Sequence, residues 1–173
     1  MFIVIVLSLA LKEKANFNIG IIGEGEVTLI ELLEALQKKS NLKEIKGIVY
    51  HQDTLAAEPV VTEPREFISD LDSLPFPEYS VFDSVNKVIF DYPLLTSRGC
   101  PYPCIYCCVG KVSGRRLRLR NIEKVLEEIE LAQSKYQSKN FQILDDNFTY
   151  DINRTKGFCR LLIKNKINMS WSC

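Results

Sequence analysis

Residues 92–107 read YPLLTSRGCPYPCIYC, and this stretch decides the fold. Residues 92–97 predict a strand, and a loop with three cysteines follows directly. Cys100, Cys104 and Cys107 have the spacing C-x3-C-x2-C, so their thiolates can converge on one soft metal centre. Four thiolates would close a structural zinc site or a fully ligated iron–sulfur cluster, whereas three leave one coordination position open. No histidine or fourth cysteine stands at zinc-finger spacing, which disfavours a zinc knuckle.

The residues after the cysteine loop alternate between predicted helices and strands. Asn121 is suited to cap a helix that ends near Tyr136. The apolar face of this helix comprises Ile122, Val125, Leu126, Ile129 and Ala132. A strand at 141–144, a helix at 152–165 and a strand at 167–172 follow. This order predicts an α/β fold with parallel strands and right-handed crossovers.

The residues before the cysteine loop predict a separate α/β unit. A strand at Phe17–Ile22 leads through the turn Gly23-Glu24-Gly25 into a helix at 26–39. This turn lacks the third glycine of a dinucleotide-binding fingerprint, so we interpret it as a tight turn into a helix. Residues 47–51 and 59–62 predict the two strands of a hairpin.

A proline-containing acidic stretch, REFISDLDSLPFPEYSVFD at residues 65–83, separates the two halves. Its prolines lack the backbone N–H that helices and β-sheets need for hydrogen bonds, so we interpret it as a linker. We therefore expect an α/β unit over residues 1–50, a hairpin and linker over 51–90, and a second α/β unit over 91–173.

The composition limits the classes of partner. The 173 residues include 22 Lys and Arg, 22 Asp and Glu, and one His, so the formal net charge is 0. This balance removes the global attraction to nucleic acid or anionic membrane. The basic run at 111–120 is offset by the acidic residues of the next helix, and we expect no nucleic-acid binding. The offsetting residues are Glu123, Glu127, Glu128 and Glu130.

The N-terminal run MFIVIVLSLAL, residues 1–11, is too short to span a bilayer. It lacks the positive flank of a signal peptide, and we interpret it as a buried strand rather than a targeting segment. We therefore expect a cytoplasmic protein with no membrane partner, whose six cysteines need an explanation other than stable disulfides.

The cysteine loop resembles the signature of the radical S-adenosylmethionine (SAM) superfamily. The flanking blocks GRRLRLRNIEKVLEEIE, FQILDDNFTYD and WSC are similar to the subgroup whose barrel follows a cobalamin-binding domain. Upstream, IGIIGEGEVTLIELLEAL and ISDLDSLPFPEY match the end of that domain and its linker. The resemblance implies the C-terminal part of a Rossmann-like domain over residues 1–50. It also implies the first three strands of a partial radical SAM barrel over 91–173.

The resemblance implies two cofactors and assigns residues to them. Cys100, Cys104 and Cys107 would ligate three irons of a [4Fe–4S] cluster, and the amino and carboxylate groups of SAM would chelate the fourth. Tyr106 would lie near the adenine, a contact that a flat ring suits, with simple packing as its alternative role.

The resemblance also places acceptors for the SAM ammonium at the end of the second barrel strand. Asp145, Asp146 and Asn147 occupy this position. Alternation along the strand allows only one of the two aspartates to point inward, and the sequence leaves open which one. A solvated turn or a helix cap at Asp146 or Asn147 is the structural alternative.

Two absences limit the function that the resemblance implies. The only histidine, His51, lacks the D-x-H-x-x-G pattern that ligates cobalt in relatives, so cobalamin is not expected in this chain. A full eight-stranded barrel takes about 250 residues, and three strands predict a truncated or partial member.

Two functions remain open at this point. In the first, an external electron donor supports reductive cleavage of SAM to a 5′-deoxyadenosyl radical, which acts on a small-molecule substrate that the sequence does not identify. Truncation leaves catalytic competence open, and a second polypeptide would complete the barrel. The alternative is a non-catalytic iron–sulfur or zinc-binding fragment that associates with another protein.

Overall fold

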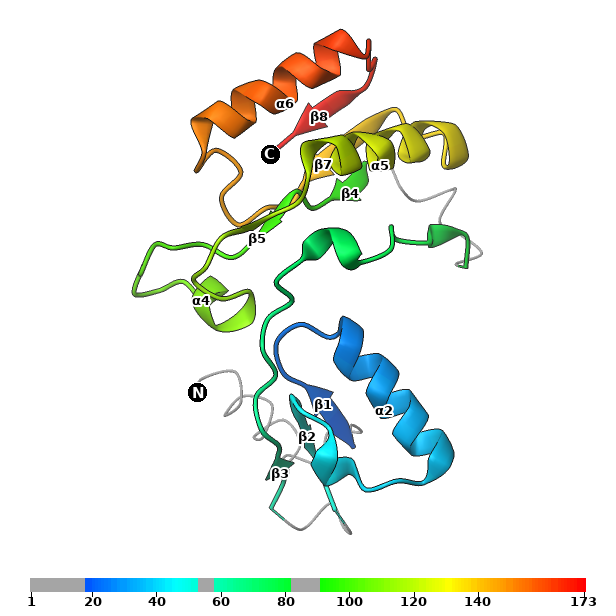
Figure 1. The fold of residues 1–173 in the computed structure, drawn as a ribbon, viewed down its shortest axis with the longest axis vertical. Coiled ribbons are helices and arrows are strands. Elements are labelled where there is room, and N and C mark those ends of the chain that lie inside the picture. The colour runs from blue at the N-terminus through cyan, green and yellow to red at the C-terminus, as the bar shows by residue number, and fades with distance from the viewer. Residues whose placement is uncertain (1–17, 53–57, 82–90) are drawn as a thin grey trace. The chain divides into compact units, whose positions relative to one another are not determined.

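The computed structural model describes residues 18–52, 58–81 and 91–173 (Figure 1). The chain divides into two compact units. The first contains the residues up to Ile68 together with Tyr102–Arg115, and the second contains Ser69–Pro101 and Arg116–Cys173. The predicted strand at residues 1–11 lies outside the described residues.

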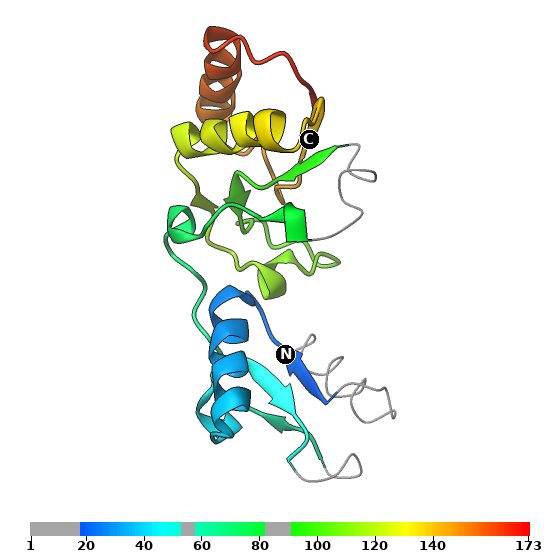
Figure 2. The same cartoon turned by 90° about the vertical axis from the view of Figure 1, so that its right-hand side faces the viewer.

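The first unit is a three-stranded sheet with one helix against it (Figure 2). The strands β1 (Ile19–Ile21), β2 (Ile48–Tyr50) and β3 (Val60–Val61) pair in this order, and both pairs are antiparallel. Helix α2 (Glu26–Lys38) packs on the sheet through the buried Leu32. The predicted helix and hairpin are confirmed.

The antiparallel pairing of β1 with β2 differs from the parallel sheet of a Rossmann-like unit. The segment after α2, which includes the 3-10 turn η1 (Leu42–Glu44), is long enough to run back past the helix and so permits this reversal. The 13 residues of α2 cover about 20 Å, and residues 39–47 can extend further than that. Ile22 N–H then donates to Gly47 O, which places β2 beside the end of β1.

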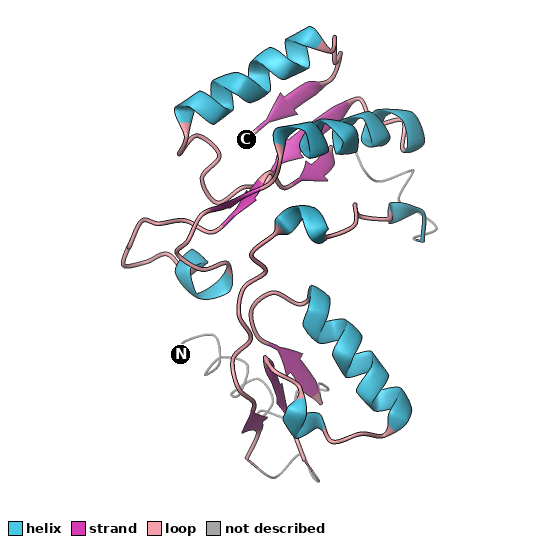
Figure 3. Ribbon diagram, viewed as in Figure 1, coloured by secondary structure: helices cyan, strands magenta, loops and turns pink. Residues whose placement is uncertain are grey.

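The second unit contains a parallel sheet in the order β4–β7–β8 (Figure 3). Its strands are β4 (Tyr92–Leu94), β7 (Asn140–Ile143) and β8 (Ser170–Ser172). Helices α5 (Ile122–Lys135) and α6 (Ile152–Lys164) connect them. The predicted alternation of helices with parallel strands is confirmed.

The core of the second unit lies between the sheet and the two helices. Its buried residues are Tyr92, Leu94, Val125, Ile129, Ala132, Phe141, Ile143, Phe158 and Leu162. Alternate residues of β4 and β7 therefore face the same helices, as the pleat of a strand requires. Trp171 stacks on Phe141 with ring centroids 5.9 Å apart and meets the edge of Phe158 at the same distance. This contact closes the core at β8.

The predicted strand at 92–97 is wrong in its extent. Strand β4 ends at Leu94, and the chain then enters β5 (Ser97–Arg98), which pairs antiparallel with β6 (Arg118–Leu119) in a separate ribbon. The backbone N–H groups of Thr96 and Ser97 bind the Asp145 carboxylate, so they do not continue the ladder with β7. The loop between β5 and β6 carries the cysteines and the short helix α4 (Val109–Val112).

The linker forms local turns around its prolines. The 3-10 turns η2 (Leu71–Ser73) and η3 (Tyr79–Val81) stand on either side of Pro75 and Pro77. Leu71 is buried and Tyr79 packs against the core, so this stretch is part of the second unit. Over residues 18–52, 58–81 and 91–173, no helix has the length and apolar character needed to cross a membrane.

Replacing the cap of α5 tests how this helix begins. The Asn121 side chain accepts hydrogen bonds from the backbone N–H groups of Glu123 and Lys124. Asn121→Ala should lower the free energy of unfolding of the second unit by about 1 kcal/mol, because these donors lose their acceptor. Fluorescence of Trp171, the only tryptophan, reports this unfolding in urea. Asn121→Ser should stay close to wild type, and an equal loss in both variants would contradict the capping role.

Candidate functional site

The cysteines of the motif lie in the loop between β5 and β6. Cys100 is half-buried, whereas Cys104 and Cys107 are exposed. All six cysteines are free thiols in the structure, so none of the motif is committed to a disulfide. The thiols are therefore accessible to a metal.

The structure brings together two of the three motif cysteines. Cys107 N–H donates to Cys104 O over 3.2 Å, which closes one turn of the loop. Cys100 belongs to the second unit, and the other two belong to the first. Among the described residues, no three His, Cys, Asp or Glu side chains are gathered closely enough to hold a metal ion.

Tyr106 is 90 % exposed and sits between the exposed Ile105 and Cys107. Its ring therefore contributes nothing to a core, and simple packing does not explain it. An exposed aromatic ring beside a metal-binding motif is suited to stack on a flat ligand.

Asp145 is the most fully bonded carboxylate at the end of β7. Its Oδ1 accepts hydrogen bonds from the N–H groups of Thr96 (2.6 Å) and Ser97 (3.1 Å). Its Oδ2 accepts from the hydroxyls of the same two residues, at 2.6 and 2.7 Å. A carboxylate has about four acceptor positions, so these four bonds use the whole group.

Asp146 and Asn147 are held less firmly. Asp146 is exposed, and its Oδ2 accepts one hydrogen bond from Gly99 N–H at 3.0 Å. The helix-cap alternative for these two residues is wrong, because Asp151 caps α6 by accepting from Asn153 and Arg154 N–H.

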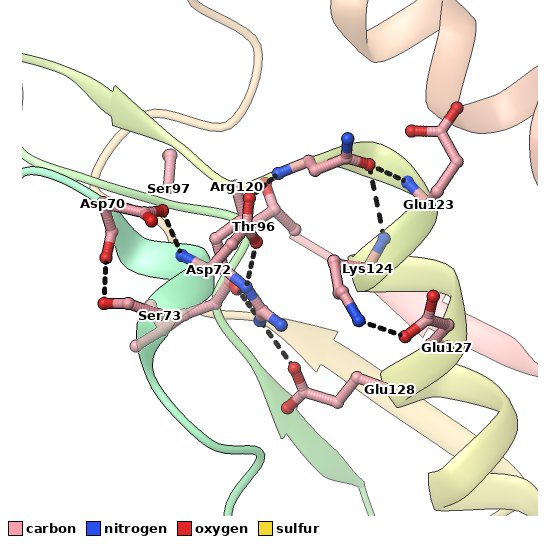
Figure 4. Close-up of polar contacts among 12 residues, drawn as sticks. Asp70, Asp72, Ser73, Thr96, Ser97, Arg120, Glu123, Lys124, Glu127 and Glu128 are labelled. Carbon is pink, nitrogen blue, oxygen red and sulfur yellow. Dashed lines mark hydrogen bonds and ion pairs between the residues drawn. The ribbon is translucent and has the colours of Figure 1, made fainter.

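Arg120 joins the linker, β4 and α5 (Figure 4). Its guanidinium lies 2.6 Å from Glu128 Oε2 and 3.7 Å from Asp72 Oδ1, and it donates to Leu95 O at 2.7 Å. The charged group also lies over the ring of Phe76, 5.7 Å from its centroid. Three segments therefore meet at the Arg120 side chain, which gives this residue a structural role.

Glu128, one of the acidic residues expected to offset the basic run, pairs with Arg120 of that run and is buried. Its side chain is only 2 % exposed and accepts a hydrogen bond from the Tyr92 hydroxyl at 3.1 Å. Burial, together with the charge of Glu128, raises the pKa of Tyr92, so this hydroxyl stays protonated as a donor. Glu128 falls on the same helical face as Val125 and Ala132, and this spacing could have predicted its burial from the sequence.

Arg154 is a second, partly buried cation that was not predicted from the sequence. From α6 it donates to Thr96 Oγ1 (3.2 Å), Thr96 O (3.2 Å) and Arg120 O (2.8 Å). Burial lowers the pKa of Arg154, and the nearby Asp145 charge acts in the opposite direction. An arginine remains protonated in this setting, so Arg154 is a fixed positive charge beside the end of β4.

A cavity of about 310 Å³ lies within the second unit. Linker residues Leu71 and Leu74 form one side, and Pro93 and Leu95 of the β4 segment form the other. Arg98 and Arg120 supply cationic groups to the lining. The second unit therefore has room for a small molecule beside the start of the cysteine loop.

Comparison with known protein families identifies the C-terminal part. Residues 94–173 match the model of the radical SAM superfamily. This match runs from the end of β4 through the cysteine loop, α5, β7, α6 and β8, and a radical SAM domain implies a [4Fe–4S] cluster and SAM as cofactors.

Two curated proteins show the extent of the sequence similarity. An uncharacterized methyltransferase of Pyrococcus horikoshii is 31% identical over 168 residues, which cover 95% of this chain and 36% of that protein. The anaerobic magnesium-protoporphyrin IX monomethyl ester cyclase of Synechocystis is 27% identical over 167 residues, which cover 92% of this chain and 32% of that protein. The chain therefore spans about a third of the length of these relatives.

Solved structures show the same fold. The radical SAM methyltransferase TsrM from Kitasatospora setae, with tryptophan and a SAM analogue bound, matches with a TM-score of 0.69 and 20% identity. The match covers 92% of this chain and 31% of TsrM. The cobalamin-dependent SAM radical enzyme OxsB matches with a TM-score of 0.70 and 24% identity, over 86% of this chain and 21% of OxsB.

Two neighbouring glutamates on α5 test the buried ion pair. Glu128→Gln should lower the free energy of unfolding of the second unit by roughly 3 kcal/mol, because Arg120 loses its buried counter-charge. Glu127→Gln removes only an exposed pair with Lys124 and should cost less than about 0.5 kcal/mol. Urea titrations followed by Trp171 fluorescence compare the two variants. Similar losses of unfolding free energy in the two variants would show that the buried pair with Arg120 stabilises the fold no more than the exposed pair with Lys124.

Proposed function

We propose that this chain, which belongs to the radical SAM superfamily through residues 94–173, binds a [4Fe–4S] cluster through Cys100, Cys104 and Cys107 and binds SAM beside it. The observation that carries this proposal is the set of free cysteine thiols in the loop between β5 and β6. Three thiols match a cluster whose fourth iron is left for another ligand. The donor chemistry therefore fits the cofactor that the family implies.

When bound, the cluster and SAM would supply radical chemistry from a 5′-deoxyadenosyl group, with an external electron donor as the reductant. The residues of this chain bind and orient these cofactors. Tyr106 offers its exposed ring to the adenine, and the half-buried Cys100 gives the loop a ligand at its fixed end. The cavity beside Arg98 is the candidate space for a small-molecule substrate.

Asp146 and Asn147 are the residues that we assign to the ammonium group of SAM. The carboxylate of Asp145 is filled by four hydrogen bonds, so it has no position left for a cation. Asp146 is exposed and accepts its hydrogen bond from Gly99, the residue before Cys100. A carboxylate here would accept the ammonium through a charge-assisted hydrogen bond.

A second polypeptide is part of this proposal. Strand β8 is exposed along its length, and a groove of about 270 Å³ runs over Cys159, Ile163 and Trp171. A further strand and helix would cover both features, as successive units do in a barrel. We propose that these elements complete the substrate site and carry most of the substrate contacts, whereas the cluster and SAM are bound by this chain.

Single replacements of the motif cysteines test the cluster. After anaerobic reconstitution with iron and sulfide, the wild-type chain should hold about four irons. Cys100→Ala, Cys104→Ala and Cys107→Ala should each lose most of this iron and the visible absorbance of the cluster. Cys108→Ala and Cys159→Ala are matched controls and should retain both.

The same preparation separates the enzyme from a non-catalytic fragment. With SAM and dithionite, the reconstituted chain should release 5′-deoxyadenosine. A stable cluster without product would favour the non-catalytic iron–sulfur fragment, and one zinc per chain without iron would overturn the radical SAM proposal for this loop.

Replacing each of the two aspartates at the end of β7 should affect a different property, SAM binding for Asp146 and stability for Asp145. Asp146→Asn should weaken SAM binding by the reconstituted chain roughly 10-fold and leave stability unchanged, because the ammonium loses a charged acceptor. Asp145→Asn should lower the free energy of unfolding by about 2 kcal/mol, because buried donors lose their acceptor. Calorimetric titration with SAM and urea unfolding measure the two quantities. Weaker SAM binding in Asp145→Asn at unchanged stability would reverse the assignment.

A further inference from the structure

We propose that Arg154 is a positioning residue that fixes both ends of the cysteine loop through Thr96 and Arg120. The inference rests on the proposed function only in taking this loop as the cluster-binding segment. Arg154 itself touches neither the motif cysteines nor the residues that we assign to SAM. Its action passes through the backbone at which the loop begins and ends.

The two stems of the loop meet at Arg154. The first stem, Thr96 to Arg98, leads from β4 through β5 into the loop. The second stem, Arg118 to Arg120, leads from the loop through β6 toward α5. Arg154 Nη2 donates to the carbonyl oxygens of both Thr96 and Arg120, at 3.2 and 2.8 Å. Arg120 N–H also donates to Thr96 O at 3.0 Å. One guanidinium therefore binds both stems at the point where they pair.

The Thr96 hydroxyl links Arg154 to Asp145 at the end of β7 through two hydrogen bonds. Its hydroxyl accepts a hydrogen bond from Arg154 Nη1 and donates to Asp145 Oδ2 at 2.6 Å. Thr96 is completely buried, so water does not compete for these groups. A cation, a hydroxyl and a carboxylate in series polarise one another, which strengthens each bond in the chain.

The cysteine motif starts directly beyond this clamp. Ser97 is also held by Asp145, and Gly99 N–H donates to Asp146. Gly99 has a φ of +89°, a conformation that glycine adopts without steric cost, and it turns the chain into Cys100. Hydrogen bonds therefore hold the backbone from Thr96 to Gly99. Because Cys100 follows Gly99 directly, these bonds also determine where the first cysteine of the motif lies.

Arg160 provides a matched control for Arg154. Both arginines lie on α6, but Arg160 is exposed. Replacing either with glutamine removes one positive charge from the same helix. Only Arg154→Gln removes the bonds to Thr96 and Arg120.

Amide hydrogen exchange of the full chain without cofactors tests the clamp. Exchange at Thr96 and Ser97 should be at least roughly 10-fold faster in Arg154→Gln than in wild type, while Phe141 and Ile143 in β7 keep their protection. Arg154→Lys should lie between the two, because it retains the charge and fewer bonds. Arg160→Gln should match wild type. Unchanged exchange at Thr96, or equal acceleration at Phe141, would overturn the proposal.

The cluster gives a second readout. In reconstituted chains, the electron paramagnetic resonance spectrum of the reduced cluster should broaden in Arg154→Gln and not in Arg160→Gln, and Arg154→Lys should restore it in part. An identical spectrum in both glutamine variants would overturn positioning of the loop. If wild type forms no cluster, the proposed function fails, and the exchange result still decides the clamp.

A second pair of variants covers the case in which Arg154→Gln does not fold. Thr96→Val removes the hydroxyl that joins Arg154 to Asp145, whereas Thr96→Ser retains it. Exchange at Ser97 should be faster in Thr96→Val and near wild type in Thr96→Ser. Equal exchange in this pair would contradict the role of the hydroxyl.

Discussion

The carboxylate of Asp145 imposes the constraint on which the second unit depends. It accepts two backbone N–H groups and two hydroxyls from Thr96 and Ser97, so it takes the place of a neighbouring strand at the end of β4. Backbone donors that are buried without partners cost free energy, and a single side chain satisfies these two. The chain can therefore leave the parallel sheet after Leu94 and enter the β5–β6 ribbon that carries the cysteine loop.

Buried charge holds the rest of this region together. Arg120 forms ion pairs with Glu128 and Asp72 and donates to the carbonyl of Leu95, and the Tyr92 hydroxyl donates to Glu128 Oε1. Removing one partner of a buried ion pair is costly, because it leaves an uncompensated buried charge. Here the pair fixes the linker to the same corner of the sheet from which the loop departs.

Local pattern predicted most of the secondary structure. The helical spacing of Val125, Ile129 and Ala132 and the cap at Asn121 gave α5 nearly to the residue, because both signals act within one or two turns. The antiparallel pairing of β1 with β2 was not predicted, because the direction of a return segment depends on contacts distant in sequence. The burial of Glu128 was not predicted, although its spacing from Val125 and Ala132 places it on the buried face of the helix.

The sequence by itself determined the three-cysteine motif, the alternation of helices and parallel strands, and the resemblance to radical SAM proteins, since each is written in residue types at short spacings. The tertiary structure decided which aspartate at the end of β7 has its acceptor positions filled and which accepts a single hydrogen bond. Asp145 and Asp146 are chemically identical, and only the approach of Thr96 and Ser97 to one of them distinguishes the two. The same holds for Arg154, whose role arises from contacts with residues 58 and 34 positions away. Such contacts exist only after the chain has folded.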